Sequence, residues 1–65
     1  MYRLSLADHA TGAKSNSTAE FPTLKWAWKA ALDIAKNENW RTGAKITHLH
    51  TGYKIGKFVV KIIEW

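Results

Sequence analysis

The chain has 65 residues, with ten Lys and Arg against five Asp and Glu, and a formal net charge of +5 at pH 7. This length allows one small domain, which buries only about 60% of the surface that its unfolded chain exposes. The absence of cysteine excludes disulfides and cysteine-ligated zinc sites. No apolar run reaches the roughly 18 residues of a membrane span, and the N-terminus lacks the apolar stretch of a signal peptide, so we expect a cytoplasmic protein.

The first segment alternates between apolar and polar side chains from Tyr2 to Leu6. A period of two predicts a half-buried strand over residues 2–7. The polar stretch 8–12 ends in glycine and predicts a turn. We expect a second, short strand near residues 15–21, paired with the first as a hairpin.

A helix is predicted next. Pro22 disfavours helical geometry in the residue before it, so the helix should begin after Phe21. Thr23 is the expected N-cap, because its hydroxyl can accept a backbone N–H that has no helical partner. From Leu24 to about Asn37 the apolar residues recur at helical spacing, and the Asn-Glu-Asn segment is expected to end the helix. The apolar face comprises Leu24, Ala27, Trp28, Ala31, Ile34 and Ala35.

Two further alternating segments, 44–50 and 55–65, predict a second hairpin. We expect its loop at residues 51–53, with a central glycine, and a register that pairs Ile46 with Phe58. A two-residue loop would mix the two faces, so the three-residue loop is preferred. One face then carries Ala44, Ile46, His48, Phe58, Val60 and Ile62. The opposite face carries Lys45, Thr47, Lys57 and Lys61 together with Leu49, Ile55, Val59 and Ile63.

The resulting element order is β-β-α-β-β over a single domain, residues 1–65. One helix covers one face of an antiparallel sheet, which makes a two-layer α+β fold.

The segment Phe21-Pro22-Thr23-Leu24, followed by Ala27, Ala30, Ala31 and Ala35 and then by a basic, glycine-containing hairpin, resembles small ββαββ proteins of phages and prophages. Some anti-CRISPR inhibitors have this size and layout. The resemblance implies a non-enzymatic binding protein and transfers no functional residues. These proteins usually have Glu or Lys where Trp26 and Leu32 stand here.

Catalytic and metal-binding motifs are weak. Asp8 and His9 are adjacent, but the nucleophile would have to come from a loop serine or threonine (Ser15, Ser17 or Thr18), and the chain has no G-x-S-x-G turn. A turn aspartate beside a solvent-facing histidine is the preferred interpretation. The glycines form no nucleotide-binding motif. We therefore expect neither an enzyme nor a cofactor.

Histidines offer the only metal-ligand pattern in the sequence. His48 and His50 share one face of a strand, and His9 would be the third ligand of a zinc site. No carboxylate has suitable spacing to complete or orient such a site. We expect no metal.

Positive charge is the stronger indication. Lys25, Lys29 and Lys36 follow one side of the predicted helix beside Trp26. Lys25 and Lys29 repel each other, and Lys25 lies in the first turn, where the helix dipole disfavours cations. An anionic partner would turn both penalties into attraction, although lysines on a helix also serve solubility alone.

A second basic region is expected on the open sheet face, from Arg3, Lys45, Lys57 and Lys61, with Tyr53 at the loop. A sheet with cations and aromatic rings can bind single-stranded nucleic acid by stacking and phosphate contact. The candidate binding residues are Lys25, Trp26, Lys29, Lys36, Arg41, Lys45, Tyr53, Lys57 and Lys61.

The tryptophans divide between core and surface. Trp28 is on the inward helix face, whereas Trp26 points away from it and is a candidate contact residue, because tryptophan is enriched at binding hot spots. Alternatively, Trp26 folds over Trp40 or the hairpin edge and completes a thin core. Trp40 and Trp65 can do likewise.

The outer sheet face would also expose an apolar patch of Leu49, Ile55, Val59 and Ile63, with Trp65. Such a patch is unusual for a monomer, so a second copy, through this face or an edge strand, or a protein target would cover it.

These observations predict a non-catalytic binding protein that occludes a nucleic-acid or nucleoprotein surface. The alternative is a dimeric protein-interaction module that inhibits a host protein without touching nucleic acid. We expect no membrane association.

Overall fold

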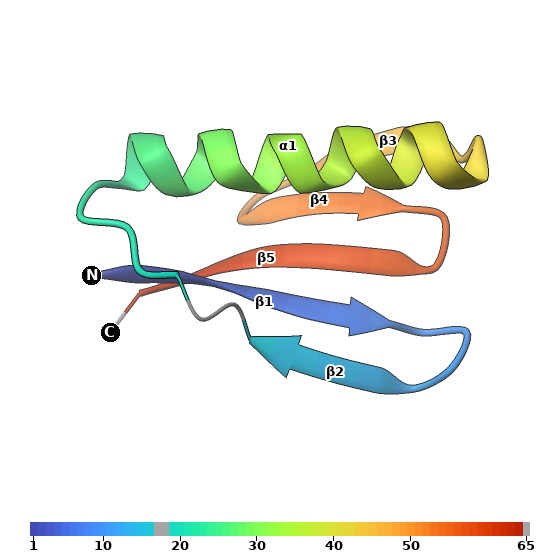
Figure 1. Cartoon of the computed structure of the whole chain (residues 1–65), viewed down its shortest axis with the longest axis horizontal. Coiled ribbons are helices and arrows are strands. Elements are labelled where there is room, and N and C mark those ends of the chain that lie inside the picture. Colours follow the sequence, from blue (N-terminus) through green and yellow to red (C-terminus); the bar gives the residue numbers. More distant parts are fainter. Residues whose placement is uncertain (17–18, 65) are drawn as a thin grey trace.

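A computed structural model describes residues 1–16 and 19–64, and it contains a five-stranded antiparallel sheet with one helix lying across one face (Figure 1). The strands lie in the order β2-β1-β5-β4-β3. The predicted α+β fold class is therefore confirmed. The elements are β1 (Tyr2–Asp8), β2 (Ala13–Asn16), α1 (Leu24–Thr42), β3 (Ile46–Leu49), β4 (Gly52–Ile55) and β5 (Phe58–Glu64). The interpretations that involve Ser17, Thr18 and Trp65 lie outside the described residues.

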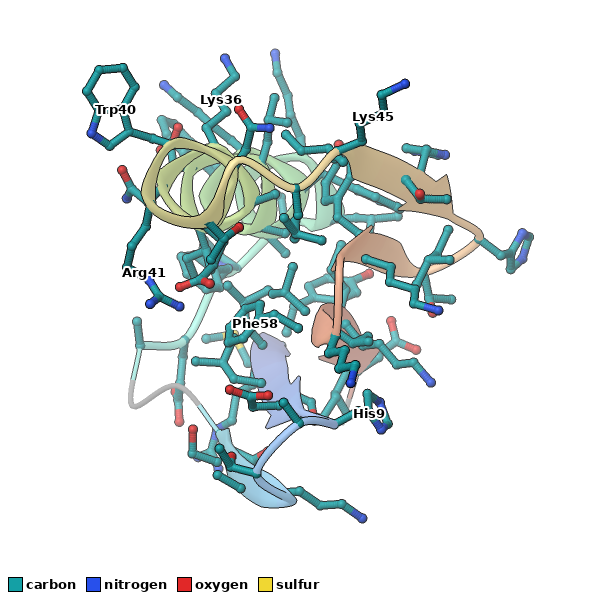
Figure 2. The ribbon with its side chains drawn as sticks, turned by 90° about the vertical axis from the view of Figure 1, so that its right-hand side faces the viewer. His9, Lys36, Trp40, Arg41, Lys45 and Phe58 are labelled. Carbon is teal, nitrogen blue, oxygen red and sulfur yellow. The ribbon has the colours of Figure 1, made fainter. Side chains whose placement is uncertain are left out.

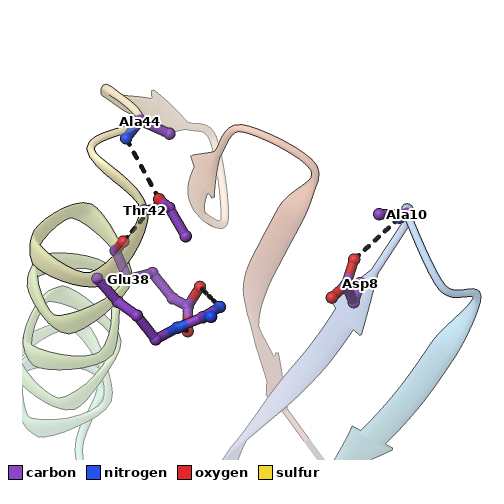
Figure 3. A network of polar contacts seen from close by, with 6 residues as sticks. Asp8, Ala10, Glu38, Thr42 and Ala44 are labelled. Atoms are coloured by element: carbon purple, nitrogen blue, oxygen red, sulfur yellow. Dashed lines mark hydrogen bonds and ion pairs between the residues drawn. The ribbon is translucent and has the colours of Figure 1, made fainter.

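The first hairpin forms as expected, but its second strand is displaced. β2 begins at Ala13 rather than near residue 15, because Gly12 closes the turn with a left-handed backbone (φ 76°) and pairing resumes at once. The Gly12 N–H donates to the Asp8 carbonyl at 2.8 Å, and the Asp8 carboxylate accepts the Ala10 N–H at 2.9 Å (Figure 3). Phe21, placed in the second strand by its sequence, forms only an isolated bridge with Tyr2.

The helix begins where the sequence predicts. Thr23 is extended (φ −129°, ψ 152°), and its hydroxyl accepts the Trp26 N–H at 3.3 Å. This bond satisfies one of the N–H groups that a helix start leaves without a partner.

The predicted helix end near Asn37 is wrong, since α1 continues to Thr42. Gly43 caps it with a left-handed backbone (φ 74°) and donates its N–H to the Asn39 carbonyl at 2.8 Å. Glycine adopts this geometry without the steric cost that asparagine pays, so the chain stays helical through both asparagines. The Thr42 hydroxyl donates to the Glu38 carbonyl and accepts the Ala44 N–H, which fixes the exit from the helix (Figure 3).

The core lies between the sheet and the alanine face of α1. Leu4, Ile55 and Val60 pack with Ala31 and Ala35, and all five are buried. Small side chains let the helix backbone approach the sheet closely, so large strand residues fill the space between them. None of the described segments forms a helix with the length and apolar character needed to cross a membrane.

The second half of the chain has three strands, not two. Gly56 adopts a left-handed turn (φ 60°) that interrupts the predicted strand 55–65 and separates Ile55, the last residue of β4, from β5. The preceding loop has two residues rather than three, and Ile46 pairs with Ile55 rather than with Phe58. The predicted loop and register are therefore wrong. The two-residue loop does not place lysines among the apolar side chains that face the helix, because the turn at Gly56 starts a new alternation of side chains in β5.

This register removes most of the expected apolar patch. Ile55 faces the helix and belongs to the core. On the open face Val59 is buried and Leu49 is half-buried, which leaves Ile63 as the exposed member at 39%. The patch of four exposed aliphatic side chains is not present.

Tyr2 and Glu64 face each other at the end of the β1–β5 pair. The Glu64 carboxylate accepts a hydrogen bond from the Tyr2 phenol, and this bond, followed by the negative charge itself, raises the pKa of Tyr2. Folding therefore holds the phenol proton more tightly than the unfolded chain does. The resulting stabilisation is present below about pH 10 and is lost as the pH rises through the raised pKa.

We expect Glu64→Gln to lower the pKa of Tyr2, because it removes the charge that disfavours the phenolate. An ultraviolet absorbance titration in a Tyr53→Phe background measures this, since the chain has two tyrosines. An unchanged titration would show that the two side chains do not interact.

Candidate nucleic-acid interface

The solvent side of α1 carries a row of cations and indoles. The residues recur three, four or seven positions apart, so they lie on one side of the helix. We call this set the helix surface: Lys25, Trp26, Lys29, Lys36 and Trp40. All five are exposed, with Trp26 at 54% and Trp40 at 90%. Figure 2 shows Lys36 and Trp40 pointing away from the sheet.

Trp26 stands at the rim of a depression of about 480 Å³ near the start of the helix. The depression is lined by Lys25, Trp26, Trp28, Lys29, Leu32 and Tyr53. The Lys29 ammonium lies 5.0 Å from the centroid of the Trp26 ring, within the range of a cation–π contact. An indole face, a cation and a hollow therefore lie together.

Trp26 does not pack on Trp40, so that part of the alternative is wrong, whereas Tyr53 of the β3–β4 hairpin lines the same depression as Trp26. The two tryptophans are about four helical turns apart, roughly 21 Å at 1.5 Å per residue. Each indole stands separately on the helix surface, with Lys29 and Lys36 between them along the axis. Asp33 lies on the same side of the helix and is its one carboxylate there.

Behind the depression, three rings hold the helix to the sheet. The Trp28 ring stacks on His48 with centroids 5.3 Å apart, and Tyr53 meets Trp28 edge-on at 5.5 Å. Trp28 thus fills the inward position that its spacing predicts. Tyr53 is not on the open sheet face as expected, because the two-residue loop places it in β4 with its ring toward the helix.

The arginines differ from the lysines. Arg41 binds Glu38 through two hydrogen bonds, of 3.2 and 2.7 Å, and the hydrogen bond and the charge of Glu38 raise the pKa of Arg41. Figure 2 shows Arg41 on the side of the helix nearer to Phe58, away from Lys36. Arg3 pairs with Glu20 at 2.9 Å. In the described part of the chain, no lysine forms an ion pair with a carboxylate.

The remaining predicted cations lie elsewhere. Lys45 points outward beside β3, at the edge of the sheet (Figure 2). Lys57 and Lys61 lie on the open face of the sheet with His9, Lys14 and Lys54, and we call this second set the sheet surface. The structure therefore places four of the nine candidate residues on the helix surface, two on the sheet surface, Lys45 at the sheet edge, Arg41 in an ion pair and Tyr53 between the helix and the sheet.

The three histidines do not come together. His48 is stacked on Trp28, His50 is in the turn after β3, and His9 lies on the sheet surface. Among residues 1–16 and 19–64, no group of three or more His, Asp or Glu side chains is arranged to hold a metal ion.

Trp40 is a member of the helix surface that the sequence pattern does not predict as a contact residue, because the helix is expected to end at the asparagines before it. Gly43 is the signal that would have found it, since a glycine cap there extends the spacing of Trp26, Lys29 and Lys36 by one more turn.

Comparisons with protein families, with curated proteins and with solved structures found no match for this chain.

Proposed function

We propose that this protein is a non-catalytic binding protein that holds single-stranded nucleic acid on the helix surface. The observation that carries the proposal is the exposed Trp26 ring with the Lys29 ammonium 5.0 Å from it, beside a hollow lined by two further aromatic rings. The resemblance to small phage-encoded inhibitors fits a protein that occludes a nucleic acid or nucleoprotein from other factors.

The chemistry of the helix surface suits unpaired bases. A base that stacks on an exposed indole gains about 1–3 kcal/mol, and any base can do so because each has a π-face. Lys25 and Lys29 line the same depression as the ring, so they can reach the phosphates of a stacked nucleotide. Stacking and phosphate contact are thus available at the same point.

The exposed rings and cations continue along the helix, so the helix surface can contact a longer stretch of a nucleic-acid strand. Trp40 provides a second exposed ring roughly 21 Å along the helix from Trp26, and Lys36 precedes it by one turn. A strand that follows the helix axis would meet a ring, two cations and a second ring in that order. This arrangement favours an extended single strand over a compact ligand.

Salt dependence tests the proposal. Three lysine–phosphate contacts on a single strand give a slope of about −2 in log affinity against log salt, or about a 20-fold loss between 50 and 200 mM. Fluorescence anisotropy with a labelled, unstructured oligonucleotide measures it. We expect Lys25→Gln/Lys29→Gln to reduce the magnitude of the slope by about 1.4. A flat salt response, or no binding at low salt, would exclude this function.

The alternative of a dimeric protein-interaction module has less support. The dimer was predicted from four aliphatic side chains on the outer sheet face. In the described residues, three of the four are buried or half-buried, and one of these, Ile55, faces the helix. Pairing of an edge strand with a second copy is the remaining route to a dimer. Light scattering at high concentration tests it, and a dimer that does not bind nucleic acid would favour the alternative.

A further inference from the structure

The open face of the sheet presents a second cluster of positive charge. Two depressions of about 340 and 230 Å³ share His9, Val59 and Lys61 as lining residues. Lys54 and Lys57 border the first, and Lys14 borders the second. These residues come from β1, β2, β4 and β5 and their turns, so the cluster spans most of the sheet.

The strand register fixes how the cations are distributed. Lys14 lies opposite Ala7, Ala7 opposite Val59, and Val59 opposite Lys54. At the usual strand spacing, the two lysines stand about 14 Å apart across the sheet. Lys61 lies two residues along β5 from Val59, about 7 Å away in the perpendicular direction. The lysines are therefore distributed over an area of the sheet rather than along a line. Ala7 and Val59 lie between them and form a low floor.

No described strand residue puts an acidic side chain on this face. Asp8 and Glu64 occupy the alternate positions of β1 and β5, which point toward the helix side. Glu20 forms an ion pair with Arg3. Among the described residues, none of these lysines forms an ion pair with a carboxylate, so an anionic partner would relieve their mutual repulsion.

We propose that the sheet surface binds the phosphate backbone of double-stranded nucleic acid. A duplex keeps its bases stacked inside and presents phosphates from two strands, and cations spread over two dimensions match that pattern. The floor offers small and aliphatic side chains, and among the described lining residues the only aromatic ring is the imidazole of His9 at its border. The charge pattern therefore fits a duplex better than a single strand.

The helix covers one face of the sheet (Figure 1), and the residues of the sheet surface lie on the other face. A duplex on the sheet surface leaves the helix surface free, so one molecule can hold a duplex and a single strand together. This bridging step depends on the proposed function of the helix surface, whereas duplex binding does not.

Duplex affinity is the direct test. Four lysine–phosphate contacts give a slope of about −3.6 against log salt, or about a 150-fold loss between 50 and 200 mM. We expect Lys54→Gln/Lys61→Gln to reduce the magnitude of the slope by about 1.8 for a labelled duplex and to leave single-strand binding unchanged. Lys25→Gln/Lys29→Gln is the matched control, since it removes the same charge from the helix side. The inference is overturned if the sheet variant binds duplex as the wild type does.

Three further outcomes separate the two proposals. If only single-strand binding is found, and only the helix variant weakens it, the helix function stands and the duplex site is overturned. If duplex binding falls in the sheet variant while no single strand binds, the duplex site stands and the helix function is lost. If the sheet variant loses binding to phosphatidylserine vesicles but not to duplex, the face serves a lipid surface and the inference is overturned.

Bridging has its own readout. Beads that carry a biotinylated duplex should retain a labelled single strand when the wild-type protein is added, and either lysine double variant should reduce this retention. Retention in the sheet variant equal to that of the wild type would contradict the two-surface arrangement.

Discussion

Gly52→Ala is expected to lower the free energy of unfolding by about 2–3 kcal/mol, near the upper end of the cost of overpacking. Gly52 is buried at the start of β4, opposite Lys61 of β5. A Cβ atom there would overlap the Val60 carbonyl oxygen and lie 2.9 Å from the Lys61 Cα. Both are backbone atoms, so no side-chain rotation relieves the overlap.

The strand that would have to move is the one least able to do so. β5 pairs with β1 on one side and β4 on the other, and Val60 is in the core. A domain of this size has a net stability of only about 3–10 kcal/mol. We therefore expect the melting temperature to fall by roughly 10–20 °C, at 4–8 °C for each kcal/mol.

Gly12→Ala is the matched control for backbone strain. Gly12 is left-handed (φ 76°), but an added Cβ would meet nothing within 4 Å. Its cost should be the left-handed penalty alone, about 1–2 kcal/mol. Thermal and urea unfolding of both variants compare the two effects. If Gly52→Ala costs no more than Gly12→Ala, crowding at β4 does not limit this fold.

The sequence predicted those elements whose signals are local. Pro22 and Thr23 mark the helix start by fixing backbone geometry and a hydrogen-bond acceptor, and neither depends on distant residues. The alanine spacing likewise identified the face that meets the sheet. These features follow from chemistry within one helical turn.

The failures came from glycines whose role depends on the backbone angle they adopt. Gly43 and Gly56 are both left-handed. The helix continues to Gly43, beyond the end that periodicity predicted, and Gly56 interrupts a segment that periodicity predicted as one strand. Alternation continues through residues 55–65 whether or not a turn divides them, so the pattern could not reveal the division into β4 and β5. The boundary between β4 and β5 is determined by the pairing of β5 with both β1 and β4, which is partly between residues far apart in the sequence.

The residues of the candidate site show the same difference between local and non-local signals. Lys25, Trp26 and Lys29 lie within two turns of the helix start, and the sequence placed them together correctly. Tyr53, Lys14 and Lys54 owe their faces to strand register, so an error of one residue in a loop put Tyr53 on the wrong side. Surfaces carried by one helix were thus more predictable than surfaces assembled from four strands.

The double variant Trp26→Ala/Trp40→Ala is expected to cause the largest loss of single-strand binding. Each indole should contribute about 1–3 kcal/mol by stacking, which corresponds to about 5- to 150-fold in affinity. The two rings are roughly 21 Å apart along the helix, so their contributions should add. The combined loss is then at least about 25-fold, measured by anisotropy with the same labelled oligonucleotide.

The fold should tolerate this change, which makes the loss interpretable. Both indoles are more than half exposed, and neither belongs to the core cluster, so the free energy of unfolding should change by less than about 0.5 kcal/mol for each. Leu24→Ala is the control: Leu24 is 46% exposed on the same helix and about 160° around the axis from Trp26. It should leave binding unchanged. Equal losses in the control and the double variant would mean that apolar area on α1, rather than stacking on the helix surface, drives binding, and full binding by the double variant would remove the basis for the proposed function.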